Sequence, residues 1–351
     1  MEGTALIITN GYFMLNDAKT AHGLVRGTER YKIAGVIDNK CAGKDAGEVL
    51  DNTTRNIPVF ASLEEALEKL NYKIDFGIIG VATHGGYLPD ELLKVVKSFI
   101  ENGISIVNGL HDLVSNRPEM RELADKNNCK IYDIRKPRTF NELHFWTGKI
   151  KEVNVPKIAV LGTECAIGKR TTARMLTQSL RKKGFKSEMI FTGQTGWLQG
   201  GKYGFIFDST PNDFISGEIE NAIYNCYKEA QPDIIFVEGQ SALRNPSGPC
   251  GSEFLLSGKM DGVILQHQPS RKFFDDEEEY GKLPEIEEEI ALIKMYGVKT
   301  LAVCLNTFGL APNEIKSVQE EYAERTGIPV ILPLQEGVDE ITELLKKVFM
   351  L

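Results

Sequence analysis

A glycine-bounded loop between a buried strand and an amphipathic helix is the segment of this sequence best suited to chemistry. The apolar run Lys157 to Leu161 leads into a loop that begins at Gly162 and ends at Gly168, and Lys169 opens the helix. The glycines let the backbone turn tightly, and the N–H groups at the helix start converge on one spot, which favours an anion such as phosphate. This is the pattern of a phosphate-binding loop, or P-loop. The residues it predicts to hold a cofactor are Gly162, Thr163, Cys165, Ala166, Ile167, Gly168, Lys169, Arg170, Thr171 and Thr172.

The loop departs from the usual P-loop pattern in two ways. Five residues, 163–167, separate its glycines instead of four, a longer form that is similar to the loop of dethiobiotin synthetase and its relatives. Arg170 follows the lysine, where a serine or threonine normally holds Mg²⁺. Thr171 lies one place further on, about 100° around the helix. The phosphate cradle survives these changes, and the Arg170 guanidinium would add fixed positive charge where the metal is expected.

Three side chains are candidates for catalysis. Glu238 follows the buried run 233–237, and the carboxyl ends of parallel strands form the ligand-binding edge of an α/β sheet. In a P-loop NTPase this acid would be the Walker B acid, and without nucleotide chemistry it could be a general base. His267, in the loop after another buried run, is the second candidate base. Lys169 is a candidate donor to an oxyanion.

Further polar residues near strand ends suit a pocket for a small anion. Gly193 and Gln194 belong to a glycine-rich loop after the run 188–191 and are expected to approach the cofactor. A substrate with two carboxylates would need arginine or lysine to bind it, so the arginines of two strand-end loops are candidates. Two aspartates are also candidates, although Asp213 could equally be a helix N-cap. These substrate candidates are Arg244, Arg271, Asp208 and Asp213. No metal-ligating set is predicted.

The elements that position these residues alternate along the whole chain. Short runs that are apolar throughout are typical of parallel strands buried on both faces, and amphipathic helices such as 62–70 and 89–102 lie between them. Ser62 is the predicted N-cap of the first of these helices. The predicted strands are 5–9, 33–37, 57–60, 76–81, 104–107 and 130–134 in the first half, and 157–161, 188–191, 233–237, 262–265, 300–305 and 329–332 in the second.

This alternation predicts an α/β protein with two open, mostly parallel sheets. The polar stretch 149–156 ends in proline and suggests a linker, so residues 1–150 are predicted to form a Rossmann-like domain and residues 151–351 a P-loop NTPase-like domain. The acidic run 275–279 is expected to be a solvated loop or helix start.

The first domain lacks the dinucleotide fingerprint. Asn10 and Gly11 follow its first strand without a G-x-G-x-x-G pattern. Asp38 ends the second strand, where such folds can hold a ribose. His84, in a Thr-His-Gly-Gly segment after the fourth strand, is a further candidate to face a ligand.

Composition restricts the class of protein. The chain has 351 residues, 42% hydrophobic and 26% charged, with a formal net charge of -8, so a dedicated nucleic-acid binder is not expected. Its six cysteines form no C-x-x-C pair, which argues against a zinc ribbon or a disulfide scaffold. The sequence contains no apolar stretch of about 18 residues, so no membrane span is expected. The first strand has no basic leader before it, so a signal peptide is not expected either, and the cytoplasm is the predicted location.

Taken together, these segments resemble a known two-domain family, Rossmann-like plus P-loop, that was described only as nucleotide-binding before its association with D-glutamate N-acetyltransferases. The resemblance covers nearly the whole chain and is most specific at 162–172, followed by Thr-Gly-Gln-Thr-Gly at 192–196, Val-Glu-Gly-Gln at 237–240 and the 80–86 segment. It implies transfer of an acetyl group from acetyl-CoA to the amino group of a small acidic amino acid. Residues 240–244 depart from the Gly-Ser-rich form of the family, so amino-acid specificity stays open.

Three hypotheses follow. The first is this N-acetyltransferase, which agrees with the unusual loop because coenzyme A carries phosphates but needs no Mg²⁺. The second is an ATP- and magnesium-dependent ligase or kinase of the dethiobiotin-synthetase type. The third is a non-catalytic nucleotide or CoA sensor. The expected partner is a small acidic amino acid, and a homo-oligomer is left open.

Overall fold

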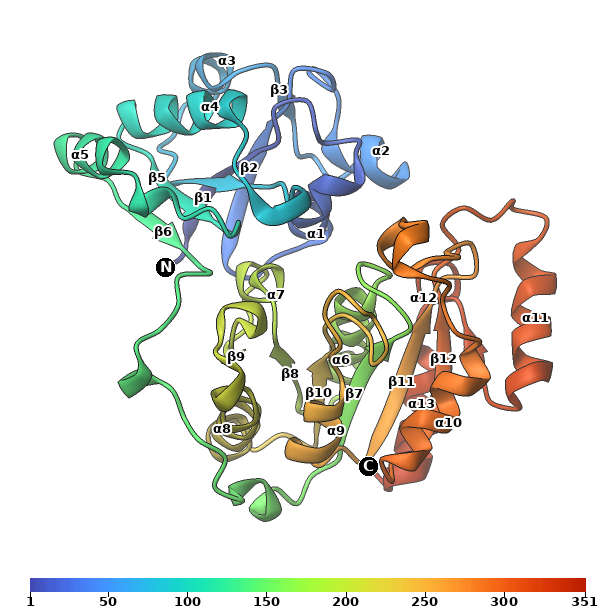
Figure 1. Ribbon diagram of the computed structural model, residues 1–351. Coiled ribbons are helices and arrows are strands. Elements are labelled where there is room, and N and C mark those ends of the chain that lie inside the picture. Colours follow the sequence, from blue (N-terminus) through green and yellow to red (C-terminus); the bar gives the residue numbers. More distant parts are fainter. The chain divides into compact units, whose positions relative to one another are not determined.

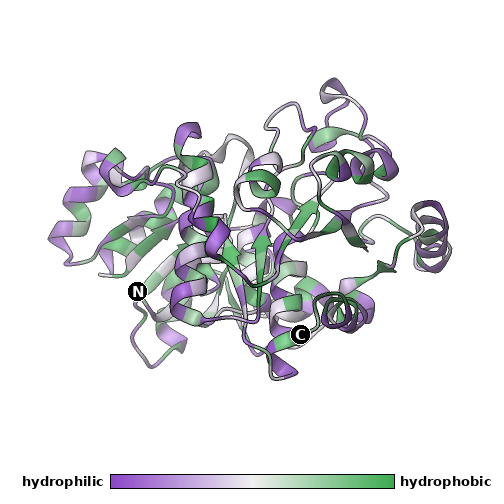
Figure 2. Cartoon of the chain, turned by 90° about the horizontal axis from the view of Figure 1, so that it is seen from below, coloured by the Kyte–Doolittle hydropathy of each residue, from purple (hydrophilic) through white to green (hydrophobic). Residues whose placement is uncertain are grey.

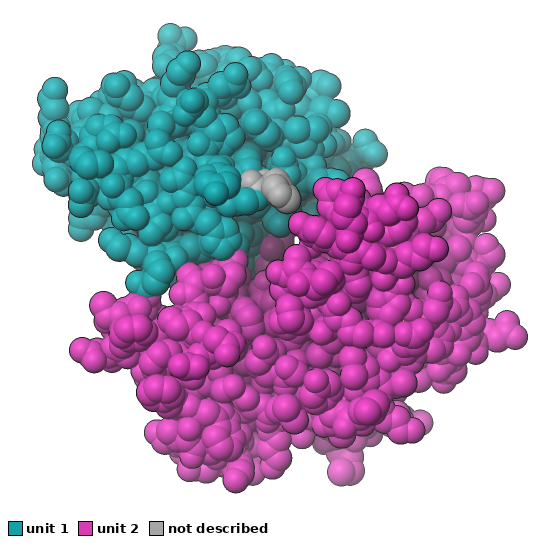
Figure 3. Space-filling view, viewed as in Figure 1, with its two compact units in different colours: residues 1–137, 194–200 teal, residues 138–193, 201–351 magenta. Residues whose placement is uncertain are grey.

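The structure, a computed structural model, describes the backbone of residues 1–351 and every side chain except that of His84. Contacts divide the chain into two compact units. Unit 1 comprises Met1–Pro137 and Gln194–Gly200, and unit 2 comprises Arg138–Gly193 and Gly201–Leu351. Figure 3 shows the two units in different colours.

Unit 1 is a parallel sheet of six strands in the order β3-β2-β1-β4-β5-β6 (Figure 1). Alternate residues of the central strand face opposite layers: Leu6 and Ile8 pack beneath α3, α4 and α5, whereas Ala5 and Ile7 pack beneath α1, α2 and α7. The strands are β1 (Gly3–Ile8), β2 (Tyr31–Ile37), β3 (Val59–Phe60), β4 (Phe76–Ile79), β5 (Ser105–Asn108) and β6 (Ile131–Asp133). The helices are α1 (Lys19–Arg26), α2 (Ala46–Asp51), α3 (Leu63–Lys69), α4 (Asp90–Glu101), α5 (Pro118–Lys126) and α7 (Gln194–Leu198), with 3₁₀ turns η1 (Asn16–Ala18), η2 (His84–Gly86) and η3 (Val114–Asn116).

Unit 2 is a parallel sheet of seven strands in the order β13-β12-β11-β7-β10-β8-β9. Its central strand alternates in the same way, with Ile158 and Val160 beneath α6 and α13, and Ala159 and Leu161 facing the layer of α8 and α9. The strands are β7 (Lys157–Gly162), β8 (Ser187–Phe191), β9 (Tyr203–Gly204), β10 (Ile234–Glu238), β11 (Gly262–His267), β12 (Thr300–Leu305) and β13 (Val330–Ile331). The helices are α6 (Lys169–Lys182), α8 (Asn212–Ala230), α9 (Ser252–Ser257), α10 (Ile286–Met295), α11 (Ile315–Thr326), α12 (Pro333–Glu336) and α13 (Asp339–Phe349), with 3₁₀ turns η4 (Phe140–Glu142), η5 (Lys149–Glu152), η6 (Phe207–Ser209), η7 (Phe274–Asp276) and η8 (Glu278–Tyr280).

Hydropathy explains why the predicted elements form. Figure 2 shows green, hydrophobic strands and helices that carry both green and purple residues, as expected for sheets covered on both faces by amphipathic helices. The predicted α/β class with two parallel sheets is confirmed. The two-residue strand β9 was not predicted, because two residues give no periodicity to detect.

The boundary between the two units lies after Pro137, not near residue 150 as predicted. Unit 2 begins at Arg138, and the stretch expected to be a linker forms η5, whose Ile150 and neighbouring Val153 lie in the core of unit 2. The polar side chains of this stretch face solvent while Ile150 and Val153 are buried, so its composition resembles that of a linker. Residues 194–200 lie in the second half of the sequence but belong to unit 1, where Leu198 is buried.

Three local features of unit 1 bear on the expectations for it. Ser62 caps α3 as predicted, its hydroxyl accepting the N–H of Glu65 at 3.3 Å. The buried carboxylate of Asp38 accepts the Thr9 hydroxyl and the N–H of Gly11 at 2.8 and 2.7 Å, so it organises its own loop. The side chain of His84 lies outside the described residues.

Among the helices described, none is long and apolar enough to cross a membrane.

Candidate functional site

The phosphate loop joins the carboxyl end of β7 to the start of α6. Gly168 caps the helix with φ at +114°, and Ala166 also has a positive φ, so the loop folds back before the helix begins. The N–H of Thr172 donates to the carbonyl of Gly168 at 3.0 Å. The N–H groups before Thr172 have no intrahelical acceptor, as at any helix start, and the positive end of the helix dipole lies there. This geometry suits an anion.

Lys169 crosses the inside of the loop. Its ammonium is buried and donates to the carbonyl oxygens of Glu164 and Ser241 at 2.5 and 2.7 Å. Gly162 leaves the room for it, because a Cβ there would lie 3.0 Å from Lys169 Cδ. Burial lowers the pKa of the Lys169 ammonium. The two carbonyl oxygens hold the Lys169 ammonium inside the loop.

Glu238 lies at the end of β10, the strand beside β7, and its carboxylate is buried. It accepts the N–H of Thr192 at 3.0 Å. Burial raises the pKa of Glu238, and the Arg170 guanidinium is the strongest influence opposing that rise. The residue that replaces the usual magnesium-binding hydroxyl therefore supplies positive charge to this carboxylate.

The two threonines that follow Arg170 differ in their surroundings. Thr172 is buried and donates its hydroxyl to the side-chain oxygen of Gln266 at 2.6 Å, which fixes α6 to the end of β11. Thr171 is half-buried. The hydroxyl of Thr172 is thus committed to the sheet.

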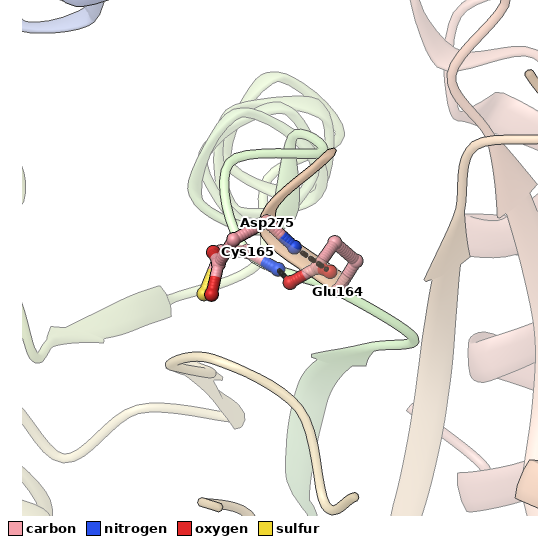
Figure 4. A group of neighbouring side chains, drawn as sticks. All are labelled: Glu164, Cys165 and Asp275. Carbon is pink, nitrogen blue, oxygen red and sulfur yellow. Dashed lines mark hydrogen bonds between the residues drawn. The ribbon is translucent and has the colours of Figure 1, made fainter. Parts of the chain in front are cut away.

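A second set of contacts ties the loop to its neighbours. Glu164 is fully buried; its carboxylate accepts the N–H of Cys165 and, at 2.7 Å, the N–H of Asp275 (Figure 4). The Asn245 amide donates to the same carboxylate at 3.0 Å and to Asp275 at 3.3 Å. Burial raises the pKa of the Cys165 thiol, which donates to the Ser241 hydroxyl at 3.4 Å.

Glu164, Cys165 and Asp275 offer ligand atoms within 4.8 Å of one another, the kind of group that can hold a metal ion, although no metal set was predicted. Both oxygens of Glu164 already accept N–H bonds, which hold the loop by themselves. The run 275–279, expected to be a solvated loop or helix start, falls in the turns η7 and η8 and is exposed except at Asp275, which is half-buried and donates its N–H to Glu164.

His267 is enclosed between two hydroxyl groups. Its Nδ1 lies 2.8 Å from Thr163 Oγ1 and its Nε2 lies 3.0 Å from the Tyr322 hydroxyl. Burial lowers the pKa of His267 to about 4, so the imidazole is neutral at physiological pH. Both ring nitrogens are occupied, and the side chain orients the second residue of the phosphate loop.

The substrate candidates are placed less favourably. Arg244 forms ion pairs with Glu288 and Glu289 at 2.8 and 2.9 Å, and Arg271 lies 3.0 Å from Asp276. Both guanidinium groups therefore have carboxylate partners within unit 2.

Asp208 in η6 and Asp213 in the first turn of α8 are exposed. The alternative interpretation of Asp213 as an N-cap is wrong. Pro211 occupies that position, because α8 begins at Asn212.

The predicted cofactor residues after β8 separate at the boundary between the units. Gly193 belongs to unit 2, and a Cβ on it would lie 3.1 Å from the Gln240 amide nitrogen and 3.8 Å from Glu238 Oε1. Gln194 begins α7 and belongs to unit 1. Of this pair, the structure brings Gly193 to the candidate base.

Sequence reasoning missed the residues that support the site from neighbouring strand ends. The Gln240 amide donates to the Thr192 hydroxyl at 2.9 Å, and that hydroxyl donates to the Glu238 carbonyl at 2.7 Å. For Thr192 and Gln240 the signal was present in the sequence, because each lies within two residues of the end of a buried strand. The supporting residues are Thr192, Gln240, Ser241, Asn245, Gln266 and Asp275.

The fold and the loop define a P-loop protein with a Rossmann-like unit. The chain belongs to the DUF1611 family. The family's P-loop domain, described as a domain of unknown function, matches residues 144–342, and its Rossmann-like domain matches residues 39–137. The family expected from the sequence is confirmed.

Similar proteins carry an activity in their names. One from a Pseudoalteromonas species, named D-glutamate N-acetyltransferase, is 31% identical over 271 residues, covering 75% of this chain and 79% of that protein. Another with the same name, from Tritonibacter scottomollicae, is 29% identical over 278 residues, covering 77% and 81%. The crystal structure of a DUF1611 family protein from Anabaena variabilis has a TM-score of 0.88 at 27% identity and covers 98% of this chain and 99% of that one.

Proposed function

We propose that this protein is an N-acetyltransferase that moves an acetyl group from acetyl-CoA to the amino group of a small acidic amino acid resembling D-glutamate. The observation that carries the proposal is the geometry of the phosphate loop, in which Gly168 caps α6 and Arg170 stands where a magnesium-binding hydroxyl is expected, so that the anion cradle has a protein cation in place of a metal ligand. The names of the two relatives supply the reaction and the acceptor class.

The phosphate loop suits a phosphate group of CoA. Lys169 and the helix start offer a positive charge and N–H donors to such an anion. CoA is used without a divalent cation, so the loss of the magnesium hydroxyl at Arg170 is no obstacle. In the ligase alternative, Glu238 at the Walker B place would have to hold Mg²⁺ next to this guanidinium, and two cations so close repel each other.

The chemistry requires a proton acceptor. The amine must be neutral to attack the thioester carbonyl; the C–N bond forms, the C–S bond breaks, and the proton from nitrogen passes to a base, which returns it to the departing sulfur so that CoA leaves as its thiol. Glu238 is the first candidate, since burial raises the pKa of its carboxyl and so makes the carboxylate a stronger base. His267 is a weaker candidate because both its nitrogens are occupied.

The length of CoA makes the role of Glu238 testable. Phosphates and thioester lie at opposite ends of the pantetheine arm, so a side chain next to the loop contacts one end only. If Glu238 is the base, Glu238→Gln lowers kcat and removes one limb of the pH profile. If Glu238 faces the phosphates instead, the same variant raises KM for acetyl-CoA and leaves the profile unchanged, which would contradict its role as base.

The proposed function is tested by measuring binding and turnover with and without Mg²⁺, in the natural protein and in Arg170→Thr. Acetyl-CoA, CoA and ATP are titrated calorimetrically with Mg²⁺ and with EDTA, and acetylated D-glutamate and released phosphate are measured. We expect CoA binding and acetyl transfer to be equal under both conditions, with little phosphate release. Arg170→Thr, which restores a hydroxyl, is expected to weaken binding of CoA in EDTA. Rapid magnesium-dependent ATP hydrolysis by the natural protein would overturn the proposal in favour of the ligase or kinase, and binding without turnover of any of these substrates would favour the sensor.

A further inference from the structure

Four large apolar side chains of unit 2 are exposed: three rings in residues 140–146 and Leu256 in α9. The exposed fractions are 72% for Phe140, 64% for Phe145, 43% for Trp146 and 60% for Leu256. The Trp146 indole donates to the carbonyl of Ser257, the residue after Leu256, at 3.1 Å. Contiguous apolar patches of this kind on soluble proteins commonly mark interaction sites.

Two buried carboxylates of α8 hold the segment that carries the three rings, residues 138–148, here called the arm. Figure 1 shows this segment as part of the green stretch of chain that follows β6. Glu218 accepts the Arg138 guanidinium, the N–H of His144 at 2.9 Å and the His144 ring nitrogen at 2.9 Å. Glu220 accepts the N–H and the hydroxyl of Thr147 at 2.6 and 2.8 Å. The arm is therefore fixed by backbone and side-chain bonds, not by burial of its rings.

The rings themselves pack only on their inner side. Phe140 and Phe145 contact the ring of Phe214 on α8, with centroids 5.8 and 4.5 Å apart, and turn their outer sides to solvent. The arm lies tightly on the helix at Gly217, where a Cβ would be 1.9 Å from the carbonyl oxygen of His144. A rigid backbone that presents exposed aromatic rings is a pre-organised binding surface, since little conformational freedom is lost on association.

We propose that the arm, together with Leu256, is the apolar centre of an isologous interface with a second copy of this chain. At about 150–250 Å² per aromatic side chain, the exposed fractions of the three rings amount to roughly 270–450 Å². A standard interface buries about 800 Å² on each partner with an apolar centre and a polar rim, so the rings and Leu256 supply the centre of such a face.

The charges around the arm fit a self-complementary contact. Exposed residues of both signs flank the rings: Glu142 and Glu152 on one hand, Lys149 and Lys151 on the other. An isologous interface places a surface against itself, so it needs both signs, whereas a surface built for a basic or an acidic partner would carry one. This inference is independent of the reaction proposed above.

Sedimentation velocity over a range of micromolar concentrations tests the proposal. We expect the natural chain to be dimeric and the double variant Phe140→Ser/Phe145→Ser to have a dissociation constant raised by about 100-fold or more. Met295→Ser is the matched control, since Met295 is 84% exposed on α10 and lies outside the patch. It should sediment as the natural chain does.

A second variant separates the interface from a loss of folding. Gly217→Ala keeps every ring but displaces the arm, and it is expected to weaken the dimer while far-UV circular dichroism shows the sheet and helices intact. A natural chain that stays monomeric at about 100 μM would overturn the proposal and leave the face to another kind of partner. So would a folded double variant that dissociates no more readily than the Met295→Ser control.

Discussion

At the scale of single residues, the exchange of a hydroxyl for a guanidinium at position 170 changes what the site can hold. A P-loop hydroxyl and a Walker B acid normally share a metal ion. Here the Arg170 guanidinium opposes the rise that burial causes in the pKa of Glu238, and the Lys169 ammonium donates to the carbonyl of Ser241. Positive charge is thus built into the protein, which suits a ligand that brings phosphate but no metal.

Replacement of Lys169 tests the cradle. Lys169→Ala removes a charge-assisted donor worth about 1.5–3 kcal/mol, so we expect CoA affinity to fall by about 10–100-fold in a calorimetric titration. Lys182→Ala, at the exposed far end of the same helix, is the control and should bind CoA normally. Unchanged affinity in Lys169→Ala would show that the loop is not the phosphate site.

The buried His267 predicts a pH dependence of stability. Its pKa is about 6.5 when unfolded and about 4 in the fold because of burial, so the unfolded chain takes up the proton first as the pH falls. The stabilisation is complete above pH 6.5 and is lost between pH 6.5 and 4, by up to about 3 kcal/mol. Urea unfolding at several pH values should show this slope in the natural chain and a flatter one in His267→Gln, whose amide does not titrate. Parallel slopes would mean that the imidazole is not kept neutral.

At the scale of elements, the carboxyl ends of parallel strands gather the site. The ends of β7, β8, β10 and β11 carry the phosphate loop, Thr192, Glu238 and His267 respectively. In unit 1, a local signal in the sequence marks where a helix begins, because the Ser62 hydroxyl caps α3.

The cap of α3 gives a quantitative expectation. Ser62→Ala removes the acceptor for the Glu65 N–H and should lower the free energy of unfolding by about 1 kcal/mol, measured by urea denaturation. Ser62→Asp supplies an equivalent acceptor and should retain stability. Equal stability of the alanine variant would show that the N–H finds another partner.

At the scale of the whole molecule, one segment packs in a different unit from the residues on either side of it in the sequence. Residues 194–200 follow β8 of unit 2 but belong to unit 1. Leu198 is fully buried in the core of unit 1, and the guanidinium of Arg30 lies 4.1 Å from the ring centroid of Trp197. The stability of unit 1 therefore depends on a segment that the chain supplies from its second half.

Truncation of Leu198 tests this dependence. Leu198→Ala is expected to destabilise unit 1 by about 2–5 kcal/mol, because it leaves a cavity in that core. Trp197 is the only tryptophan of unit 1, so its fluorescence in a Trp146→Phe background reports the unfolding of that unit. The control Leu334→Ala, at a residue 61% exposed in unit 2, should leave the transition in place. A transition unmoved by Leu198→Ala would show that the segment is dispensable.

The sequence by itself determined the class of fold, the strands with their helices, and the phosphate loop. These depend on hydropathy periods and glycine positions that act over a few residues, so they are legible along the chain. It also determined the family, through the loop at 162–172.

Only the tertiary structure decided which polar side chains are already hydrogen-bonded or ion-paired to their neighbours. Arg244 is paired with Glu288 and Glu289, and His267 is enclosed by Thr163 and Tyr322, through contacts between residues 44 to 104 positions apart. It also decided that Asp275 is half-buried against Glu164 and that residues 194–200 join unit 1. The physical reason is that burial and ion pairing depend on which strands become neighbours in the sheet, and a one-dimensional pattern contains no such distance.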